Sequence, residues 1–461
     1  MSGLKKLKNA LPEASWTDDK QLIAPWVVEW RDKYQGNTPL MVMPSSSGEV
    51  QTIVNICRNQ RLKIVPQGGN TGLVGGNTPY GEVLLSTRRM NRVRDINPVT
   101  NSLIAEAGTT LLSVQEAAAS IDRKFPLSLA SEGSCTIGGN LSTNAGGVHV
   151  LKYGTARDLV FGVEAVLPSG EIFNGLTNLR KDNTGYDLSR LFLGAEGTLG
   201  IITAASLKLF PRAGHVQRVM VGLETIADAI SLLDHCRAGN ALSMFEVMPR
   251  IGLELVTRHI PDQKDPFEDV YPWYALIDWE VGDEAMGRAI SEDKLMGASQ
   301  EGLIEDAIIA QSETQAVSLL ALRENMSAGQ KFLGGSVKLD ITIPIDRISE
   351  FLCEADQAVE KIVPACRPVA FGHLGDGNIH YNVGAPENAA TEEFLSNWQK
   401  ISDAVFDLVD KYQGSISAEH GIGTMKKDDL AKRADPAKIK MMRAIKQSLD
   451  PDNMMNPRVM I

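Results

Sequence analysis

Cysteine is scarce in this chain of 461 residues, and no two cysteines stand close together. The five cysteines form no Cys-x-x-Cys pair, and their number is odd. This usage argues against a disulfide scaffold and indicates a reducing compartment. The chain also lacks any apolar run of about 18 residues, the length that crosses a bilayer. We therefore expect no transmembrane segment.

Positive charge is in deficit, with 46 lysines and arginines against 57 acidic residues and a net charge of −11. An acidic chain repels phosphate backbones, so we expect no nucleic-acid partner. Residues 1–20 contain no apolar core of signal-peptide length. Together with the cysteine usage, this predicts a cytoplasmic location. Peripheral contact with a membrane, through Lys5, Lys6 and Lys8, is the alternative.

Length and composition predict a folded protein of two or three domains, since 43% of the residues are hydrophobic and 22% are charged. Changes in residue usage near Pro211 and Gly214 indicate a domain boundary. We expect four parts: a peripheral helical segment over 1–35, a first domain over 36–213, a second over 214–413 and a C-terminal segment over 414–461.

Apolar periodicity predicts an α+β fold. In the first domain, a helix over 45–60 lies between two strands and closes a βαβ unit. In the second domain, helices alternate with strands, which suits helices on one face of an antiparallel sheet. The predicted strands are 40–44, 62–66, 82–86, 159–168, 199–211, 274–280 and 336–344. The other two predicted helices are 226–236 and 348–363.

Glycine gathers in loops. The first loop follows a strand and contains Gly68, Gly69, Gly72, Gly75 and Gly76. Glycine allows the backbone to approach a ligand closely, and successive N–H groups in such turns bind anions. The density of this loop therefore points to a pyrophosphate rather than to a flexible turn.

Two common nucleotide motifs are missing. No Gly-x-Gly-x-x-Gly opens a helix, and no Gly-x-x-x-x-Gly-Lys-[Ser/Thr] occurs. The usual nicotinamide fold and the P-loop hydrolases are therefore disfavoured. The remaining possibility is a large dinucleotide held by several separate glycine loops. A flavin dinucleotide fits, because its pyrophosphate and ring need backbone donors from more than one segment.

Four motifs carry a family resemblance: PQGGNTGLVGG, TIGGNLSTNAGG, YGTARDLVFGVEAVLPSG and LRKDNTGYDLSRLFLGAEGTLGIIT. They resemble the FAD-binding domain of the vanillyl-alcohol oxidase / p-cresol methylhydroxylase superfamily. Within it, the chain is similar to the D-2-hydroxy acid dehydrogenases, which act on D-lactate, glycolate or D-2-hydroxyglutarate. The resemblance covers about residues 40–461. It implies a two-lobed FAD-binding domain, a substrate-binding cap and a C-terminal segment that completes the flavin site.

The resemblance also assigns residues to the flavin. Because Asn70 and Thr71 stand where some relatives have a histidine bound to flavin, noncovalent FAD is expected. Arg458 stands where the family pattern has lysine. The expected cofactor residues are Gln67, Gly68, Gly69, Asn70, Thr71, Gly72, Gly76, Glu132, Gly133, Ser134, Thr136, Gly138, Gly139, Ser142, Asn144, Ala145, Gly146, Tyr153, Gly154, Gly200, Ile202 and Asn456.

Two of the seven histidines lie in FGHLGDGNIHYNV, residues 371–383. Asp376-Gly377 is a strong two-residue hairpin signal, and such a turn places His373 opposite His380. Two imidazoles at that separation suit one metal ion, and equally suit two structural histidines joined by hydrogen bonds. Alternation along the strand puts Asn382 on the His380 face and points Ile379 and Tyr381 away.

SAEHGIG supplies Glu419 and His420 in another glycine-rich loop. Two histidines and one carboxylate form a usual set for Zn²⁺, Mn²⁺ or Fe²⁺. The resemblance implies a divalent metal, Zn²⁺, on His373, His380 and Glu419. It implies that His420 is the catalytic base.

An acidic protein needs local cations to hold an acidic substrate. Arg323 and Ser327 have the spacing of one helix face, and Lys338 follows on a strand. Arginine grips carboxylates through two parallel hydrogen bonds. In the hydroxyglutarate enzymes, an arginine, a hydroxyl residue and a lysine at this spacing bind the distal carboxylate, with threonine where this chain has Ser327. We expect these three residues and Asn382 to bind substrate.

The sequence thus predicts an FAD-dependent enzyme that oxidises a D-2-hydroxy acid, D-2-hydroxyglutarate first, by hydride transfer to flavin. The alternatives are a D-lactate or glycolate enzyme, an oxygen-using oxidase and a flavin-binding subunit without activity. An electron-transfer flavoprotein or a quinone is the expected electron acceptor. A homodimer is compatible with the sequence.

Overall fold

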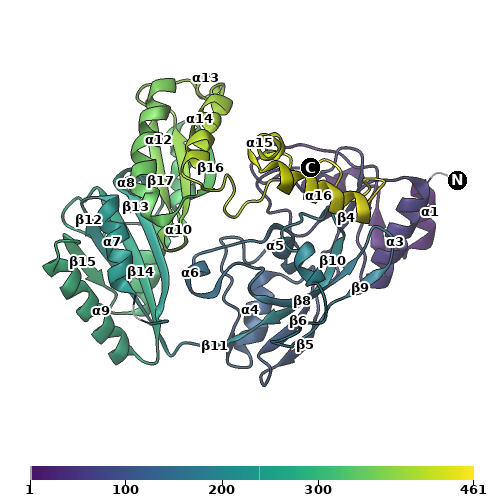
Figure 1. The fold of residues 1–461 in the computed structure, drawn as a ribbon, viewed down its shortest axis with the longest axis horizontal. Coiled ribbons are helices and arrows are strands. Elements are labelled where there is room, and N and C mark those ends of the chain that lie inside the picture. Colours follow the sequence, from purple (N-terminus) through teal and green to yellow (C-terminus); the bar gives the residue numbers. More distant parts are fainter. Residues whose placement is uncertain (1–2, 238) are drawn as a thin grey trace. The chain divides into compact units, whose positions relative to one another are not determined.

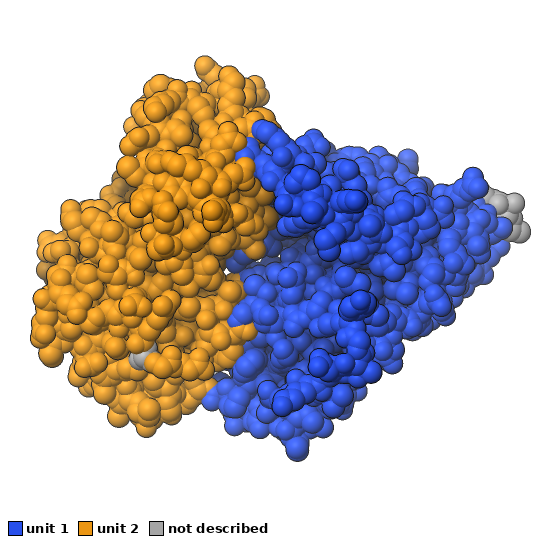
Figure 2. Space-filling model, in the orientation of Figure 1, with its two compact units in different colours: residues 1–146, 154–212, 419–461 blue, residues 147–153, 213–418 orange. Residues whose placement is uncertain are grey.

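The computed structural model describes residues 3–237 and 239–461, and the chain divides into two compact units (Figures 1 and 2). Unit 1 contains Met1–Gly146, Gly154–Arg212 and Glu419–Ile461. Unit 2 contains Gly147–Tyr153 and Ala213–Ala418. The short segment Gly147–Tyr153 therefore interrupts unit 1 in sequence and packs as part of unit 2.

Unit 1 has a four-stranded sheet of order β1-β2-β4-β3. The strands β2, β3 and β4 are parallel, as a βαβ unit requires, and β4 lies between the other two. Helix α3 connects β2 to β3 and begins where the Ser46 side chain accepts a hydrogen bond from the Glu49 N–H, a standard N-cap. The elements are β1 (Trp16–Thr17), β2 (Met41–Val42), α3 (Ser47–Gln60), β3 (Ile64–Gln67) and β4 (Val83–Ser86).

A second, antiparallel sheet of unit 1 has the order β5-β6-β10-β8-β9, and β7 pairs with β11. Its central strand β10 is buried along almost its whole length. These strands are β5 (Val93–Asn97), β6 (Ser102–Glu106), β7 (Arg123–Lys124), β8 (Val160–Val166), β9 (Ile172–Asn174), β10 (Ile201–Lys208) and β11 (Phe210–Pro211).

The N-terminal segment is less peripheral than predicted. Residues 1–2 lie outside the described part. Beyond them, the Leu7 side chain is fully buried in a core of unit 1, and β1 adds an edge strand to β2. Besides α3, the described helices of unit 1 are α1 (Gly3–Ala10), α2 (Lys20–Ile23), α4 (Leu111–Ala119), α5 (Ile137–Thr143), α15 (Lys427–Arg433) and α16 (Pro436–Leu449), with 3₁₀ turns η1 (Glu13–Ser15), η2 (Ala24–Trp26) and η3 (Leu188–Leu191).

Unit 2 is built on a seven-stranded antiparallel sheet of order β15-β12-β14-β13-β17-β18-β16. The two middle strands, β13 and β17, pair at only two positions, Glu246 with His373 and Val247 with Gly372. The sheet therefore has a short seam between two well-paired halves. The strands are β12 (His215–Leu223), β13 (Leu242–Pro249), β14 (Trp273–Val281), β15 (Asp306–Ile309), β16 (Ser336–Thr342), β17 (Arg367–His373) and β18 (Asn378–Gly384).

Helices cover both faces of this sheet, which corrects the expected single covered face. Successive residues of β13 alternate between two cores, with Phe245 and Val247 in one and Met244 and Met248 in the other. The first core takes α7 (Ile226–Cys236), α9 (Glu284–Gln300), α12 (Ile348–Ile362), α13 (Thr391–Leu395) and α14 (Trp398–Lys411). The second takes α8 (Arg250–His259), α10 (Glu313–Glu324) and α11 (Met326–Gly329).

The remaining elements of unit 2 are α6 (Val150–Tyr153), η4 (Gln330–Leu333), η5 (Ile345–Arg347) and η6 (Leu374–Asp376). The α+β prediction is confirmed by these two units. Among the described helices, none has the length and apolar character needed to cross a bilayer. The five cysteines are free, and burial raises the pKa of the Cys57 and Cys236 thiols to about 12.

A buried ion pair of unit 2 provides a stability test. The Arg218 guanidinium donates from Nε and Nη2 to the Asp278 carboxylate, at 2.7 and 2.6 Å. We expect Asp278→Asn to lower the free energy of unfolding by about 3–5 kcal/mol, because it leaves a buried guanidinium without its counterion. Urea unfolding followed by tryptophan fluorescence measures this loss.

Glu350→Gln is the matched control, since it breaks an exposed pair with Arg347 in the same unit. We expect it to cost less than about 1 kcal/mol. Equal losses in the two variants would contradict the stabilising role of the Arg218–Asp278 pair.

Candidate functional site

The two glycine loops of unit 1 lie backbone against backbone. A Cβ atom on Gly69 would lie 1.9 Å from the Ser134 carbonyl oxygen, and one on Gly68 would lie 2.2 Å from the Thr136 hydroxyl oxygen. Gly69 therefore requires glycine because backbone approaches it, whereas a side chain at Gly68 would force the Thr136 hydroxyl to turn away. The loop of the first motif and the loop of the second form one cradle, as the flavin prediction requires.

Polar atoms of this cradle are left without partners. The side-chain oxygens of Gln67 and Thr136 are buried and accept or donate no hydrogen bond within the described residues. Thr136 precedes α5, where a threonine normally caps the helix, yet its side chain makes no capping bond. Buried polar atoms are rarely left unpaired. A bound dinucleotide, rich in hydroxyl, amide and phosphate groups, supplies such partners, so the cradle fits FAD.

The C-terminal segment joins the same cradle in unit 1. The Asn456 side-chain amide donates to the carbonyl oxygens of Gly76 and Glu196, at 2.9 and 2.7 Å. The Glu196 carboxylate accepts the N–H groups of Ile422 and Gly423, at 2.7 and 2.8 Å. Burial raises the pKa of Glu196, and these two N–H groups partly oppose that rise. Glu196 thereby anchors the loop that contains Glu419 and His420.

The other expected cofactor residues fall into three groups. The Glu132 carboxylate accepts hydrogen bonds from Gln115 of α4 and from Ser128, at 3.1 and 2.8 Å. Tyr153 belongs to unit 2, where its hydroxyl donates to Glu280. The rest are residues of unit 1 that lie in or beside the loops, α5 or the start of β10: Asn70, Thr71, Gly72, Gly133, Gly138, Gly139, Ser142, Asn144, Ala145, Gly146, Gly154, Gly200 and Ile202.

The predicted substrate and metal residues of unit 2 gather on one face of its sheet. In β18, Ile379 and Tyr381 point into the apolar core, so His380 and Asn382 lie on the other face, as predicted. In β16, Lys338 is paired with Asn382, and Asp340 with His380. These pairs place lysine, asparagine, aspartate and histidine side by side.

The hairpin register differs from the predicted one. His373 faces Asn378, and Phe371 faces His380, so the two histidines are diagonal neighbours rather than opposite each other. The connection is a 3₁₀ turn over Leu374–Asp376 that closes on Gly377 at φ 83°, instead of a two-residue loop. The Leu374 side chain is fully buried in the core, and this tertiary packing overrides the local turn signal. The rings still lie 5.5 Å apart, centroid to centroid.

A carboxylate stands behind each histidine. Nδ1 of His373 lies 2.6 Å from Oε1 of Glu246, and Nδ1 of His380 lies 3.6 Å from Oδ1 of Asp340. Metal-binding histidines usually have a carboxylate or carbonyl at the second ring nitrogen, which directs the first nitrogen to the ion. The donor chemistry of this pair therefore fits a divalent metal.

Arg323 reaches the same face from the end of α10. Its Nε donates to Oε2 of Glu246 at 2.6 Å, and its guanidinium lies over the Phe371 ring, 4.9 Å from the centroid. Burial raises the pKa of Glu246, but His373 and Arg323 outweigh that effect and hold the pKa at about 2. Glu246 is therefore an ionised carboxylate between two cationic or proton-donating groups.

The helix that contains Arg323 is interrupted before Ser327. Helix α10 ends at Glu324, the chain turns at Asn325, and Ser327 lies in the separate short helix α11, where it is exposed. Gln330 of η4 accepts a hydrogen bond from the Asn382 amide at 2.9 Å. The shared role of Arg323 and Ser327 in binding substrate stays a prediction.

Three residues at this sheet face were not among the predicted site residues: Glu246, Asp340 and Gln330. Glu246 is the only charged residue of its strand, LSMFEVMP, and a lone carboxylate in an apolar strand is a signal that a partner lies nearby. Asp340 follows Lys338 by two residues, which puts both on one face of a strand. Gln330 has no comparable signal, because its role depends on how η4 packs.

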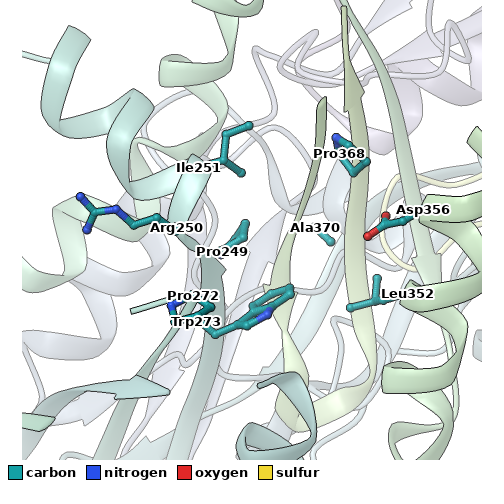
Figure 3. Close-up of a pocket in the computed structure, with 9 residues that line it drawn as sticks. All are labelled: Pro249, Arg250, Ile251, Pro272, Trp273, Leu352, Asp356, Pro368 and Ala370. Atoms are coloured by element: carbon teal, nitrogen blue, oxygen red, sulfur yellow. The ribbon is translucent and has the colours of Figure 1, made fainter. Parts of the chain in front are cut away.

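A cavity of about 320 Å³ in unit 2 contains none of the predicted site residues. It opens where β13 and β17 diverge beyond their two paired positions, between Pro249, Pro368 and Ala370 (Figure 3). Ala370 faces the core opposite to the histidines, and α12 closes the cavity with Leu352. The lining thus includes residues from both sides of the sheet, Leu352 and Ala370 from the core opposite to the histidines and Ile251 from α8 on the histidine side.

Comparison with known proteins identifies the family. Residues 212–460 match the C-terminal domain of FAD linked oxidases, and residues 38–175 match an FAD binding domain. The chain belongs to the FAD-linked oxidase family. The FAD-linked oxidase match extends over β12 to α16, so it includes both histidines, Arg323 and Glu246.

Relatives of this FAD-linked oxidase span nearly the whole chain. A mitochondrial D-2-hydroxyglutarate dehydrogenase of Arabidopsis thaliana is 35% identical over 98% of this chain and 80% of its own length. A D-2-hydroxyglutarate dehydrogenase of Xanthomonas citri is 33% identical over 98% of this chain and 95% of its own. The structure of p-cresol methylhydroxylase shares the fold, with a TM-score of 0.79 at 16% identity over 100% of this chain and 96% of that one.

The cradle of unit 1 leads to a test of flavin binding. We expect Gly69→Ala to remove most of the bound FAD, because the new methyl group would collide with the Ser134 backbone. Gly48→Ala in α3 is the control, since Gly48 is not an expected cofactor residue and a Cβ atom there would lie no closer than 3.9 Å to the Ser46 hydroxyl oxygen. The ratio of flavin to protein absorbance after purification measures both. Equal flavin content in the two variants would contradict the cradle.

Proposed function

We propose that this FAD-linked oxidase is a dehydrogenase that converts a D-2-hydroxy acid to the 2-oxo acid, with D-2-hydroxyglutarate as its substrate. The observation that carries the proposal is the sheet face of unit 2, where one histidine of a neighbouring pair, His373, and the buried Arg323 meet at the Glu246 carboxylate. A buried guanidinium is the group that best grips a substrate carboxylate. The names of the relatives support the same substrate.

The proposal includes a divalent metal, Zn²⁺, on His373, His380 and Glu419. The two histidines fit because each has a carboxylate at Nδ1. Glu419 follows Ala418, the last residue of unit 2, and Ser415 pairs with Thr342 at the end of β16. The bound metal would polarise the substrate hydroxyl and lower its pKa.

The chain's own residues would divide the remaining tasks. Arg323 and Lys338 would bind the distal carboxylate of the substrate, with Ser327 and Asn382 completing the polar lining. His420 would accept the hydroxyl proton as general base. Noncovalent FAD, when bound, supplies a ring that accepts the hydride from the substrate carbon.

Three accompanying assignments are part of the proposal. The electron acceptor is an electron-transfer flavoprotein or a quinone. The active form is a homodimer. The location is the cytoplasm, with peripheral membrane contact as the alternative, although several relatives carry the word mitochondrial in their names.

A dye-reduction screen tests the substrate. The purified protein is assayed with D and L forms of 2-hydroxyglutarate, malate and lactate, with glycolate alongside. We expect D-2-hydroxyglutarate to give the highest kcat/KM. A preference for D-lactate or glycolate would replace the dicarboxylate proposal by the monocarboxylate alternative, and peroxide formation without dye would favour an oxidase.

Lys338→Ala sharpens that test. Losing a hydrogen bond to a charged group costs about 1.5–3 kcal/mol, so kcat/KM for D-2-hydroxyglutarate should fall by about one to two decades. D-lactate is the internal control, since it has no distal carboxylate to lose. His420→Ala should impair both substrates alike. Equal losses on both substrates in Lys338→Ala would show that this lysine does not read the distal group.

Metal removal is tested separately. A strong chelator should abolish turnover while FAD stays bound, because the histidines lie outside the glycine cradle. His380→Ala should have the same effect, and added Zn²⁺ should restore the chelated wild type but not the variant. Full activity in a preparation shown to be metal-free would make these histidines structural.

A further inference from the structure

Glu246 is a single carboxylate shared by two predicted functional residues. It lies on β13 at the seam of the seven-stranded sheet and is fully buried. One oxygen, Oε1, is 2.6 Å from Nδ1 of His373, and the other, Oε2, accepts from Nε of Arg323 at 2.6 Å. Each oxygen thus has its own partner.

Each partner uses one nitrogen in its contact with Glu246, Nδ1 of His373 and Nε of Arg323. When Nδ1–H of His373 donates to Glu246, the lone pair lies on Nε2, which is the form that binds a metal. Arg323 donates to Glu246 from Nε. Its two terminal nitrogens carry four further N–H groups, and these are donors with which a guanidinium binds a carboxylate.

A further contact links Arg323 to the second histidine. The Phe371 ring lies under the Arg323 guanidinium at 4.9 Å and beside the His380 ring at 5.0 Å. Arg323 thus shares Glu246 with His373 and the Phe371 ring with His380.

Another buried ion pair on this face of the sheet, between Arg218 and Asp278, is different. The Arg218 guanidinium meets Asp278 with two nitrogens, and its third donates to the Ala316 carbonyl oxygen at 2.8 Å. All three nitrogens of that guanidinium are therefore used inside the protein, which is what a purely structural pair requires. Glu246 instead holds two side chains by one nitrogen each.

We propose that Glu246 is a positioning residue that orients the metal ligand His373 and the substrate-binding Arg323 at the same time. This inference rests on the proposed function. It makes metal binding and recognition of the substrate carboxylate depend on one buried charge. Loss of that charge should impair both, although Glu246 itself contacts neither ligand.

Glu246→Gln tests the inference in the full-length holoenzyme. His373 and Arg323 contact different oxygens of Glu246, and the amide replaces one of these oxygens by an NH₂ group, so one of the two partners then faces a donor instead of an acceptor. Removal of a carboxylate behind a metal-binding histidine typically weakens metal affinity by about 10- to 100-fold. We expect that loss for Zn²⁺, measured by competition with a chromophoric chelator. With saturating Zn²⁺, we also expect the KM for D-2-hydroxyglutarate to rise above its wild-type value by a larger factor than the KM for D-lactate does.

Asp278→Asn is the matched control, since it neutralises a buried carboxylate paired with an arginine on the same sheet. We expect it to lower stability and to leave Zn²⁺ affinity unchanged. If Glu246→Gln does not fold, Glu246→Asp replaces it, because the shorter side chain keeps the charge but cannot reach both partners. If Glu246→Asp restores Zn²⁺ affinity but not the KM for D-2-hydroxyglutarate, or the reverse, the result would support the inference that each oxygen of Glu246 serves its own partner, His373 or Arg323.

Two results would overturn the inference. The first is a folded Glu246 variant that binds Zn²⁺ as tightly as the wild type. The second is an equal loss of Zn²⁺ affinity in Asp278→Asn, because the loss would then follow from neutralising any buried carboxylate of this sheet. The wild-type arm separates these outcomes from failure of the proposed function. A wild type that binds no Zn²⁺ and oxidises no 2-hydroxy acid removes the proposed function, and the inference with it.

Discussion

An ionised carboxylate inside a protein sheet requires opposite charge or hydrogen-bond donors within reach, because burial without them costs several kcal/mol. Glu246 creates this requirement in unit 2. Its strand β13 pairs with β17 through only two residue pairs, and one of them is Glu246 with His373. The side chains of this pair are joined at 2.6 Å as well. The seam of the sheet and the candidate metal site are thus the same place.

The rest of unit 2 follows from this seam. On one face, the strands carry the polar groups that surround Glu246. Beyond their two paired positions, β13 and β17 diverge, and the cavity lined by Pro249, Pro368 and Ala370 occupies the gap between them (Figure 3). The helices α10 and α11 pack on the polar face, which is why Arg323 can reach Glu246. In unit 1, by contrast, the glycine loops provide the space for a dinucleotide and the backbone donors that bind it.

Sequence patterns that depend on local order were reliable. The helix predicted at 226–236 is α7 with the same bounds, and alternation correctly placed Asn382 beside His380 and away from Tyr381. The glycine density at 67–76 correctly indicated a tight loop next to a second one. Long motifs of this kind also carried the family, which the comparisons confirm.

Features set by tertiary packing could not be read from the sequence. Burial of Leu374 changed the hairpin register, and the chain turn at Asn325 separated Ser327 from Arg323. The N-terminal segment contributes to the core because Leu7 packs against distant strands, which no local pattern reveals. Glu246 was missed for a similar reason, since a single acidic residue in a strand indicates that a partner exists but does not identify it.

The histidine pair in front of Glu246 and Asp340 is the proposed metal site of a 2-hydroxy acid dehydrogenase. A crystal structure of the Zn²⁺-loaded protein, with anomalous differences collected at the zinc absorption edge, tests this proposal. We expect one strong anomalous peak within about 2.0–2.1 Å of a ring nitrogen of both His373 and His380. A Zn²⁺-loaded protein whose anomalous peak lies elsewhere, with the two imidazoles bound only to protein groups, would contradict it.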